Sequence, residues 1–318
     1  MVSAIKEICK EVRFYEELET LINKNVWINH FESVQIKSGW VDFEQEISKI
    51  IQVLDQIRVK VDQEWRDKES RYNLSSYEIN ILRSVISGVS FNLDAQMVEN
   101  IKNQLLIDLY RLTRCLEIYL SEYVNEIQVT NKLACIEKLS IQKVLSFNYT
   151  NTFKRIYTNG DLKEIEYDYI HGIASSENNI NTCNLIIGID EYLDDDRKDS
   201  DNEFIQFKKF YQRIYKRTGN KYLTWIEERE DEITWLNSPK FNIYIYGHSL
   251  DVTDKDILRR MIMAPEATIT IFYHNQEAFG KQIMNMVKLI GQDELISRTG
   301  GSNPSIFFVN ALEVELSK

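Results

Sequence analysis

The clearest indication of the fold class is a short apolar run that ends in amide and hydroxyl residues, Lys143-Val-Leu-Ser-Phe-Asn-Tyr-Thr-Asn-Thr152. From about Ser140 onward, further runs of this kind follow, with helical stretches between them. Short apolar runs that alternate with helices are typical of parallel strands joined by crossover connections. The sequence therefore predicts an α/β domain over residues 140–318, built on an open parallel sheet with helices on both faces.

Later runs complete the predicted sheet: Ile165-Glu-Tyr-Asp-Tyr-Ile170, Asn184-Leu-Ile-Ile187, Asn242-Ile-Tyr-Ile-Tyr246, Thr268-Ile-Thr-Ile-Phe-Tyr273 and Ser305-Ile-Phe-Phe-Val309. The gaps between them hold predicted helices at roughly 204–236, 253–263 and 275–290. Sheets of this Rossmann-like kind bind ligands outside the carboxyl ends of their strands, because loops and helix N-termini with free backbone N–H groups converge there.

The first 139 residues read as a large helical region. Apolar residues recur there at steps of three and four, the spacing of an amphipathic helix that faces a core. One stripe runs from Val2 to Ile22, and a second runs from Leu105 to Tyr123. A helix that opens at Trp40 carries a third stripe, made of Ile47, Ile50, Ile51, Leu54 and Ile57. With three prolines and 11 glycines in the whole chain, no clean linker separates the two regions, so we expect one compact body.

The charge balance disfavours nucleic acid as a partner. The chain holds 38 Lys and Arg against 49 Asp and Glu, a formal net charge of -11. A field of this sign repels phosphate backbones and anionic lipid surfaces. Basic residues do gather in one stretch, and on a helix such a cluster is usually a solvated face. They are Lys208, Lys209, Arg213, Lys216, Arg217 and Lys221.

Cysteine usage and hydropathy predict a cytoplasmic protein. Cys9, Cys115, Cys135 and Cys183 are scattered, without the C-x-x-C spacing of a zinc site or a redox pair. We expect reduced, mostly buried thiols and no bound metal. No run approaches the ~20 apolar residues of a membrane span, and no leader pattern opens the chain.

One segment is dense in acidic residues: Asp190-Glu-Tyr-Leu-Asp-Asp-Asp-Arg-Lys-Asp-Ser-Asp201. It lacks the alternating ligand spacing and the central glycine of an EF-hand calcium loop. We therefore expect a solvated, mobile loop.

Polar groups and glycines follow four predicted strands in succession. Asn148, Thr150 and Asn151 follow the first strand, and His171 and Gly172 follow the second. Gly188 and Asp190 follow the third strand, whereas the fourth is followed by Gly247, His248 and Ser249. Because carboxyl ends of parallel strands meet at one edge of a sheet, these residues are candidates for a shared ligand site.

Each of these residues also has a purely structural interpretation. Asn148, Thr150 and Asn151 suit turns and helix caps, the glycines suit positive φ, and His171 suits a hydrogen-bonded core position. Asp254 suits the first turn of a helix, or a ribose hydroxyl if it faces the ligand. Two of the four histidines, His171 and His248, nevertheless stand at the ends of these four predicted strands, which favours a shared site.

Four motifs resemble those of the AbiH family of bacterial phage-defence proteins, and they occur in the same order. They are Ser-Phe-Asn-Tyr-Thr-Asn-Thr-Phe (146–153), Ile-His-Gly (170–172), Leu-Ile-Ile-Gly-Ile-Asp (185–190) and Tyr-Gly-His-Ser-Leu-Asp-Val-Thr-Asp (246–254). Trp40-Val-Asp-Phe-Glu44 is similar to the early helix of that family. The resemblance spans roughly residues 25 to 300 and implies a role in abortive infection.

More distantly, the same order resembles sirtuin-like domains, which bind NAD and in several defence systems destroy it. That resemblance implies that Asn148 positions the ribose and nicotinamide, and that His171 is a base near the ribose. It also implies nucleotide contacts from Gly247, His248 and Ser249. Both families usually open with a strand and a glycine-rich turn, written Gly-Asn-Gly-Phe-Asp in AbiH proteins. This chain opens with Met1-Val-Ser-Ala-Ile-Lys-Glu-Ile and has no glycine before Gly39. We expect either that the sequence starts after this strand and turn, or that the nucleotide pocket lacks the half that the glycine-rich turn would form.

Three functions follow as hypotheses. The first is an abortive-infection effector that binds NAD, with His171 and Asn148 as catalytic residues in hydrolysis of its glycosidic bond. In it, Thr150, Asn151, Gly188, Asp190, Gly247, His248, Ser249 and Asp254 contact the nucleotide. The second is a non-catalytic module that senses a nucleotide or a phage-derived trigger, and whose N-terminal helices pass the signal on or form homo-oligomers. The third is a metal-dependent hydrolase that uses His171, Asp190, His248 and Asp254, although no two of these have the i, i+4 helix spacing of common zinc motifs.

Overall fold

The computed structural model describes residues 14–33, 42–64, 74–86, 94–129, 131–158, 165–232 and 241–316. These residues form two compact units that interleave along the chain. Unit 1 comprises Met1–Ile127, Ser146–Thr152 and Tyr169–Gly219, and unit 2 comprises Gln128–Leu145, Phe153–Asp168 and Asn220–Lys318. The change of pattern near Ser140 is therefore a change of element type and not a border between the units.

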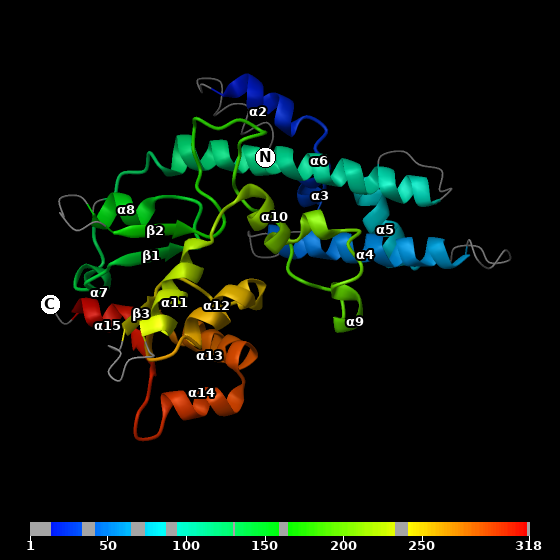
Figure 1. Cartoon of the computed structure of the whole chain (residues 1–318). Helices are drawn as coiled ribbons and strands as arrows, with labels where there is room; N and C mark the ends of the chain where they lie inside the picture. The colour runs from blue at the N-terminus through cyan, green and yellow to red at the C-terminus, as the bar shows by residue number, and fades with distance from the viewer. Residues whose placement is uncertain are drawn as a thin grey trace. The chain divides into compact units, whose positions relative to one another are not determined.

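The N-terminal part of unit 1 is helical, as its apolar spacing predicts. Its elements are α2 (Tyr15–Ile22), α3 (Val26–Ser33), α4 (Phe43–Glu64), α5 (Ser76–Val85), α6 (Ala95–Tyr119) and the π-helix η2 (Leu120–Val124). The long helix α6 packs against α2, α3 and α4 (Figure 1). Its N-terminus is capped by Asp94, whose carboxylate accepts from the N–H of Met97 at 2.7 Å. The part of the first stripe before Phe14 lies outside the described residues.

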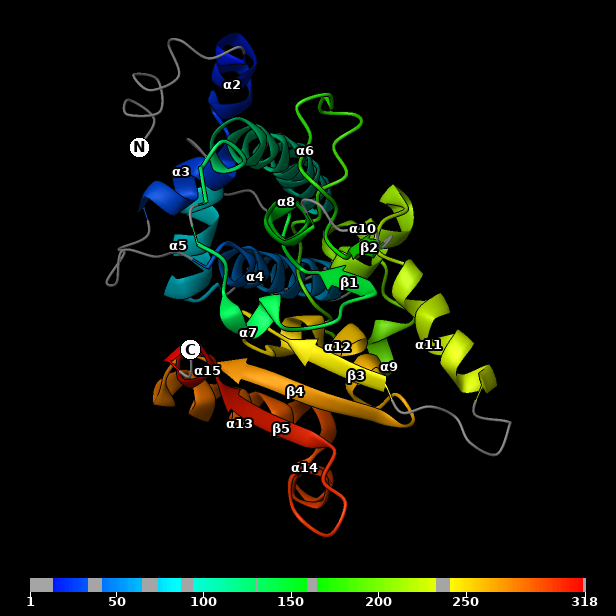
Figure 2. The same cartoon turned by 90° about the vertical axis from the view of Figure 1, so that its left-hand side faces the viewer.

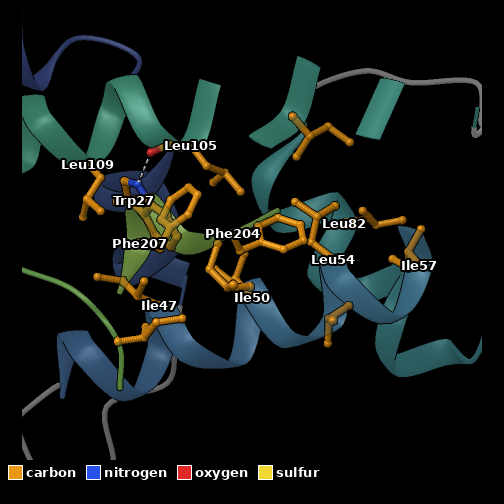
Figure 3. Close-up of a cluster of buried hydrophobic side chains, with 14 of the residues drawn as sticks. Trp27, Ile47, Ile50, Leu54, Ile57, Leu82, Leu105, Leu109, Phe204 and Phe207 are labelled. Atoms are coloured by element: carbon orange, nitrogen blue, oxygen red, sulfur yellow. Dashed lines mark hydrogen bonds between the residues drawn. The ribbon is translucent and has the colours of Figure 1, made fainter. Parts of the chain in front are cut away.

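The core of unit 1 lies between α4 and α6. All five residues of the predicted α4 stripe are buried in it, together with Leu105 and Leu109 of α6. Figure 3 shows Trp27 of α3 in this core, where its indole N–H donates to the carbonyl of Leu105 at 2.8 Å. Phe204 and Phe207, far away in sequence, insert between the same helices. The helices therefore need a distant segment to complete their core.

The predicted strand at 184–187 does not form a ladder, so this part of the predicted sheet is wrong. Ile186 donates its N–H to the carbonyl of His171 at 2.9 Å, and Ile189 forms an isolated parallel bridge with Lys208. The run is apolar because it is buried in unit 1, where Leu185, Ile186 and Ile187 are at most 5% exposed. Burial alone does not distinguish a strand from an extended segment.

The acidic segment 190–201 is exposed or half-buried throughout, as expected of a solvated segment, and several of its residues form ion pairs. It contains the short helix α9 (Asp195–Lys198), which is linked to α4 by an ion pair. Arg197 contacts the carboxylate of Asp55 at 3.0 Å and that of Asp201 at 2.6 Å, and Arg58 of α4 contacts Asp201 at 2.6 Å. Asp55 and Arg58 of α4 therefore tie this solvated segment to the helix.

The basic residues on and just before α10 (Lys209–Lys216) do not form a solvated face, whereas Arg217 and Lys221 of the same cluster are exposed. Lys208 and Lys209 are 2% and 4% exposed, and they pair with Glu191 and Glu44, at 2.8 and 2.7 Å. Lys216 donates to the carbonyl of Leu185 at 2.6 Å, and burial lowers its pKa. The helix therefore turns its basic side inward, and its exposed apolar residues are Phe210, Ile214 and Tyr215.

In its described part, unit 2 contains five strand segments in two small sheets. The strands are β1 (Lys143–Ser146), β2 (Glu166–Tyr169), β3 (Phe241–Ile245), β4 (Ala267–Tyr273) and β5 (Ile306–Asn310). The last residues of β1 and β2 belong to unit 1. The sheet orders are β1-β2 and β3-β4-β5. The N–H of Glu166 donates to Gln142 and that of Ile170 to Ser146, so β1 and β2 run in the same direction.

The β3-β4-β5 sheet is parallel, with Ile243 opposite Ile269 and Ile269 opposite Ile306. Two helices lie along one of its faces (Figure 2), α12 (Lys255–Ile262) and α13 (Gln276–Ile290). The remaining helices of the unit are α7 (Ala134–Glu137), α8 (Thr152–Tyr157), α11 (Lys221–Glu232), α14 (Gln292–Thr299) and α15 (Ala311–Leu316). Cys135 of α7, Phe272 and Ala311 form a small buried cluster on this sheet.

The predicted fold class is confirmed in its coarse form, as a mixture of helices with small parallel sheets. Among the described residues, the strands form two separate sheets, so the single open sheet of the prediction is not observed. The predicted helix at 204–236 is split into α10 and α11. Arg217 ends α10 at φ +54, and Gly219 follows at φ +63, where a Cβ would stand 2.7 Å from the backbone of Ile170. A Rossmann-like topology remains a prediction.

Candidate functional site

A tight turn between β1 and α8 presents the first group of candidate residues. The hydroxyl of Ser146 accepts from the N–H of Asn148 at 3.2 Å, which fixes the start of the turn. At its end, the hydroxyl of Thr150 lies 2.8 Å from that of Thr152, the first residue of α8. Asn148 is exposed, and Thr150 and Asn151 are half-buried. The turn therefore offers an amide to solvent and holds hydroxyls beside it.

Three segments of unit 1 meet at this turn. The N–H of Ala174 donates to the carbonyl of Tyr149 at 2.7 Å. The hydroxyl of Tyr149 donates to the carbonyl of Ile186 at 2.7 Å, and the N–H of Ile186 donates to the carbonyl of His171 at 2.9 Å. The structure therefore brings together the residues that follow the first, second and third predicted strands.

The imidazole of His171 lies in an aromatic environment. Its ring centroid is 5.9 Å from that of Phe147 and 6.1 Å from that of Tyr149, and the residue is 4% exposed. A general base must reach the proton that it takes, directly or through one water. The buried ring therefore favours a role in shaping the site, and the predicted catalytic role of His171 remains a prediction.

Two glycines in this region permit close backbone approach. Gly172 has φ +81, and a Cβ there would stand 2.3 Å from the carbonyl oxygen of Asn184. At Gly188 a Cβ would stand 2.5 Å from the carbonyl oxygen of Phe207. Real Cβ atoms do not tolerate such distances, so both positions require glycine. Asp190 comes two residues after Gly188 and is exposed.

The second group of candidates forms a corner after β3 in unit 2. Gly247 has φ +69 and Leu250 has φ +60, so the chain turns sharply between them. The N–H of Leu250 donates to Nδ1 of His248 at 2.9 Å, so Nδ1 is an acceptor and Nε2 carries the proton. Nε2 lies 3.7 Å from a carboxylate oxygen of Asp254, which is itself buried. His248 therefore holds the corner through Nδ1, while Nε2 faces the carboxylate of Asp254.

Two amides of α13 fix the same corner, and no motif in the sequence pointed to them. Asn285 donates to the carbonyl of Ser249 at 2.9 Å. Gln282 donates to the carbonyls of His248 and Phe272, at 3.3 and 3.2 Å. Both residues stand more than thirty positions after the corner, inside an otherwise apolar helical pattern. No local pattern links them to Ser249.

The candidate residues divide between the two units. Unit 1 holds Asn148, Thr150, Asn151, His171, Gly188 and Asp190, and unit 2 holds Gly247, His248, Ser249 and Asp254. Within the residues that the structure describes, no group of three or more His, Cys, Asp or Glu side chains could hold a metal ion.

The buried carboxylate of Glu117 on α6 fixes the loop after His171. The sequence patterns do not predict this role. Glu117 is 0% exposed and contacts Arg114, also 0% exposed, at 2.7 Å. Its other oxygen accepts from the Asn178 amide at 2.5 Å and from the N–H of Ser175 at 3.4 Å. The apolar stripe of α6 gave no reason to expect a charge at this position.

The thiols near this loop are expected to be unreactive. Burial raises the pKa of Cys183 to about 12 and that of Cys115 to about 12. At pH 8 such a thiol is a thiolate in about one molecule in ten thousand, and only the thiolate attacks a disulfide reagent. In a Cys9→Ser variant, we expect Ellman's reagent to titrate the three remaining thiols, Cys115, Cys135 and Cys183, only after denaturation, because Cys135 is buried as well. Rapid reaction of any of these thiols in the folded protein would contradict this expectation.

Together these features define a class: a protein of mixed helices and small parallel sheets, with polar turns after the strands. The chain matches the family model described as bacteriophage abortive infection AbiH over residues 6–273. It therefore belongs to the AbiH family, and this membership implies a role in abortive infection by bacteriophage. No curated protein and no solved structure matches the chain. None of the helices in the described part combines the length and apolar character that a membrane span needs.

Proposed function

We propose that this AbiH chain acts in abortive infection by recognising a nucleotide at the junction of three segments of unit 1. The segments are 146–152, 169–174 and 184–190, and we refer to them as the strand-end junction. The observation that carries the proposal is the pair of hydrogen bonds from Tyr149 and Ala174 that joins them, at 2.7 Å each. Ligand sites commonly combine such a rigid backbone with a few polar groups aimed at the ligand.

The polar groups of the junction suit the sugar of a nucleotide. The amides of Asn148 and Asn151 and the hydroxyl of Thr150 both donate and accept hydrogen bonds, as ribose hydroxyls require. The exposed carboxylate of Asp190 would accept from a hydroxyl and would repel a phosphate. A ligand with accessible ribose hydroxyls therefore fits better than a bare phosphate. NAD and ADP-ribose are the first candidates, because the motifs resemble those of NAD-binding domains.

The environment of His171 favours recognition without turnover. Its ring is 4% exposed and stands beside two aromatic rings, so water and substrate lack a direct path to it. The second candidate function is NAD hydrolysis, favoured by the contact of His171 with the ring of Tyr149, the residue next to Asn148. In that reaction water would add to the ribose C1′ while the bond to nicotinamide breaks, and His171 would take the proton of the water.

Calorimetric titration of the purified chain with NAD and with ADP-ribose tests the proposal. We expect binding of both ligands. Asn148→Ala should weaken binding about tenfold, the size expected for one or two lost hydrogen bonds. The matched control is Asn181→Ala, at an exposed position in the same unit outside the junction. Free nicotinamide measured in the same samples separates hydrolysis from recognition. No heat with either ligand at millimolar concentration would contradict the proposal.

Assembly and triggering do not depend on the strand-end junction. We retain the proposals that the N-terminal helices form a homo-oligomer and that a phage-derived component triggers the protein. Light scattering of the chain alone tests the first proposal: a monomer at micromolar concentration would contradict it.

A further inference from the structure

We propose that Tyr149 is the positioning residue of the strand-end junction, holding His171 and the 184–190 segment in place beneath the exposed turn. This inference rests on the proposed nucleotide recognition, and it assigns a role to a side chain that touches no ligand itself. Tyr149 lies in the middle of the turn, between the exposed Asn148 and the half-buried Thr150. Its side chain nevertheless points away from the exposed turn and into unit 1.

The hydroxyl and the backbone carbonyl of Tyr149 form hydrogen bonds with two different segments. The hydroxyl donates to Ile186 at 2.7 Å, and the carbonyl accepts from Ala174 at 2.7 Å. Ile186 in turn donates to the carbonyl of His171 at 2.9 Å. These bonds connect the turn to Ala174 directly, and to His171 through Ile186. A displacement of Tyr149 therefore moves the segments on both sides of His171.

The ring of Tyr149 adds apolar packing contacts to the hydrogen bonds of its hydroxyl and carbonyl. It lies against the buried cluster of Ala174, Cys183 and Leu185, and it contacts the imidazole of His171 at a centroid distance of 6.1 Å. Leu120 packs against the same cluster. Leu120 is the first residue of the π-helix η2, a local widening of a helix that is frequent at functional sites. The junction is thereby anchored to the end of α6.

The phenol is chemically suited to this position. An aromatic ring fills the cluster, and a buried hydroxyl needs a partner, which the carbonyl of Ile186 provides. Tyr149→Phe keeps the ring and its packing but leaves the carbonyl of Ile186 without this donor. The change therefore separates positioning by the hydroxyl from filling of the core by the ring.

The test is Tyr149→Phe, followed by deuterium exchange at the imidazole C2 of each histidine. This exchange depends on access of solvent to the ring, and it requires no ligand. We expect His171 to exchange slowly in the wild type and about fivefold faster in Tyr149→Phe, the effect of one net hydrogen bond on a local opening equilibrium. The exposed His274 serves as internal reference. Tyr77→Phe, at an exposed tyrosine of α5, is the matched control and should leave His171 unchanged.

Affinity for ADP-ribose is the second readout. We expect Tyr149→Phe to weaken binding about fivefold and to leave the thermal unfolding midpoint close to that of Tyr77→Phe. If the wild type binds no nucleotide, the proposed function fails, but exchange at His171 still decides the positioning role. Unchanged exchange at His171 in Tyr149→Phe overturns the inference, whatever the wild type binds. Faster exchange in both Tyr149→Phe and Tyr77→Phe also overturns it, because the effect would then not be specific to the junction.

Discussion

Gly172→Ala is expected to destabilise the protein by about 3 kcal/mol, because two costs coincide at this position. The backbone stands at φ +81, which an L-residue with a side chain adopts only with strain. In addition, the new methyl group would stand 2.3 Å from the carbonyl oxygen of Asn184, so the segments after β2 and before Gly188 must separate. Chemical denaturation with urea, followed by circular dichroism, measures the change.

Gly280→Ala is the matched control for that substitution. Gly280 lies inside α13, and a Cβ there would meet nothing within 4 Å. Alanine should stabilise this helix by about 0.8 kcal/mol, since glycine is a poor helix former. Equal stability of the two variants would show that Gly172 is not confined as described. Because Gly172 follows His171 directly, Gly172→Ala should also abolish nucleotide binding at temperatures where the protein remains folded.

Arg114→Met is expected to destabilise the protein by about 3 to 5 kcal/mol. Arg114 and Glu117 are both 0% exposed and lie 2.7 Å apart, so removal of the cation leaves an uncompensated charge in the interior. Arg114 also contacts Glu17 of α2 at 2.8 Å, and that carboxylate is one-third exposed, so solvent can screen it. The loss should therefore arise mainly at Glu117. Denaturation at neutral pH measures it.

A double variant separates charge burial from loss of packing. Arg114→Met combined with Glu117→Gln removes both charges and should recover part of the stability lost in the single variant. Lys281→Met, which breaks an exposed pair with Glu277 on α13, is the surface control and should change stability little. If the double variant were less stable than Arg114→Met by the full cost of Glu117→Gln, the two charges would not be coupled.

Local sequence patterns predicted most helices and strands, because each depends on residues close in the chain. The stripe from Ile47 to Ile57 and the runs that became β3, β4 and β5 are of this kind. The run at 184–187 was misinterpreted because burial produces the same apolar signal whether or not a strand partner is present. The inward direction of Lys208 and Lys209 depends on Glu191 and Glu44, and the second of these partners is distant in sequence.

The candidate site was predicted in part for the same reason. Asn148, Thr150, Asn151 and His171 stand in local motifs, and the structure brings their segments together in unit 1. Tyr149 stood in the same motif, but only its distant contact with Ile186 shows what its hydroxyl does. The role of Glu117 could not be predicted, because it lies within an apolar stripe and its partner Asn178 is distant in sequence. A contact between residues about sixty positions apart cannot be predicted from the spacing of neighbouring residues.

If the strand-end junction is one nucleotide-binding site, NAD should protect all three of its segments together. Amide deuterium exchange of the wild-type chain, with and without saturating NAD, measures this protection. We expect slower exchange with NAD in peptides that cover 146–152, 169–174 and 184–190, and unchanged exchange in α13. Saturation by NAD with no slowing in these three segments would contradict this expectation.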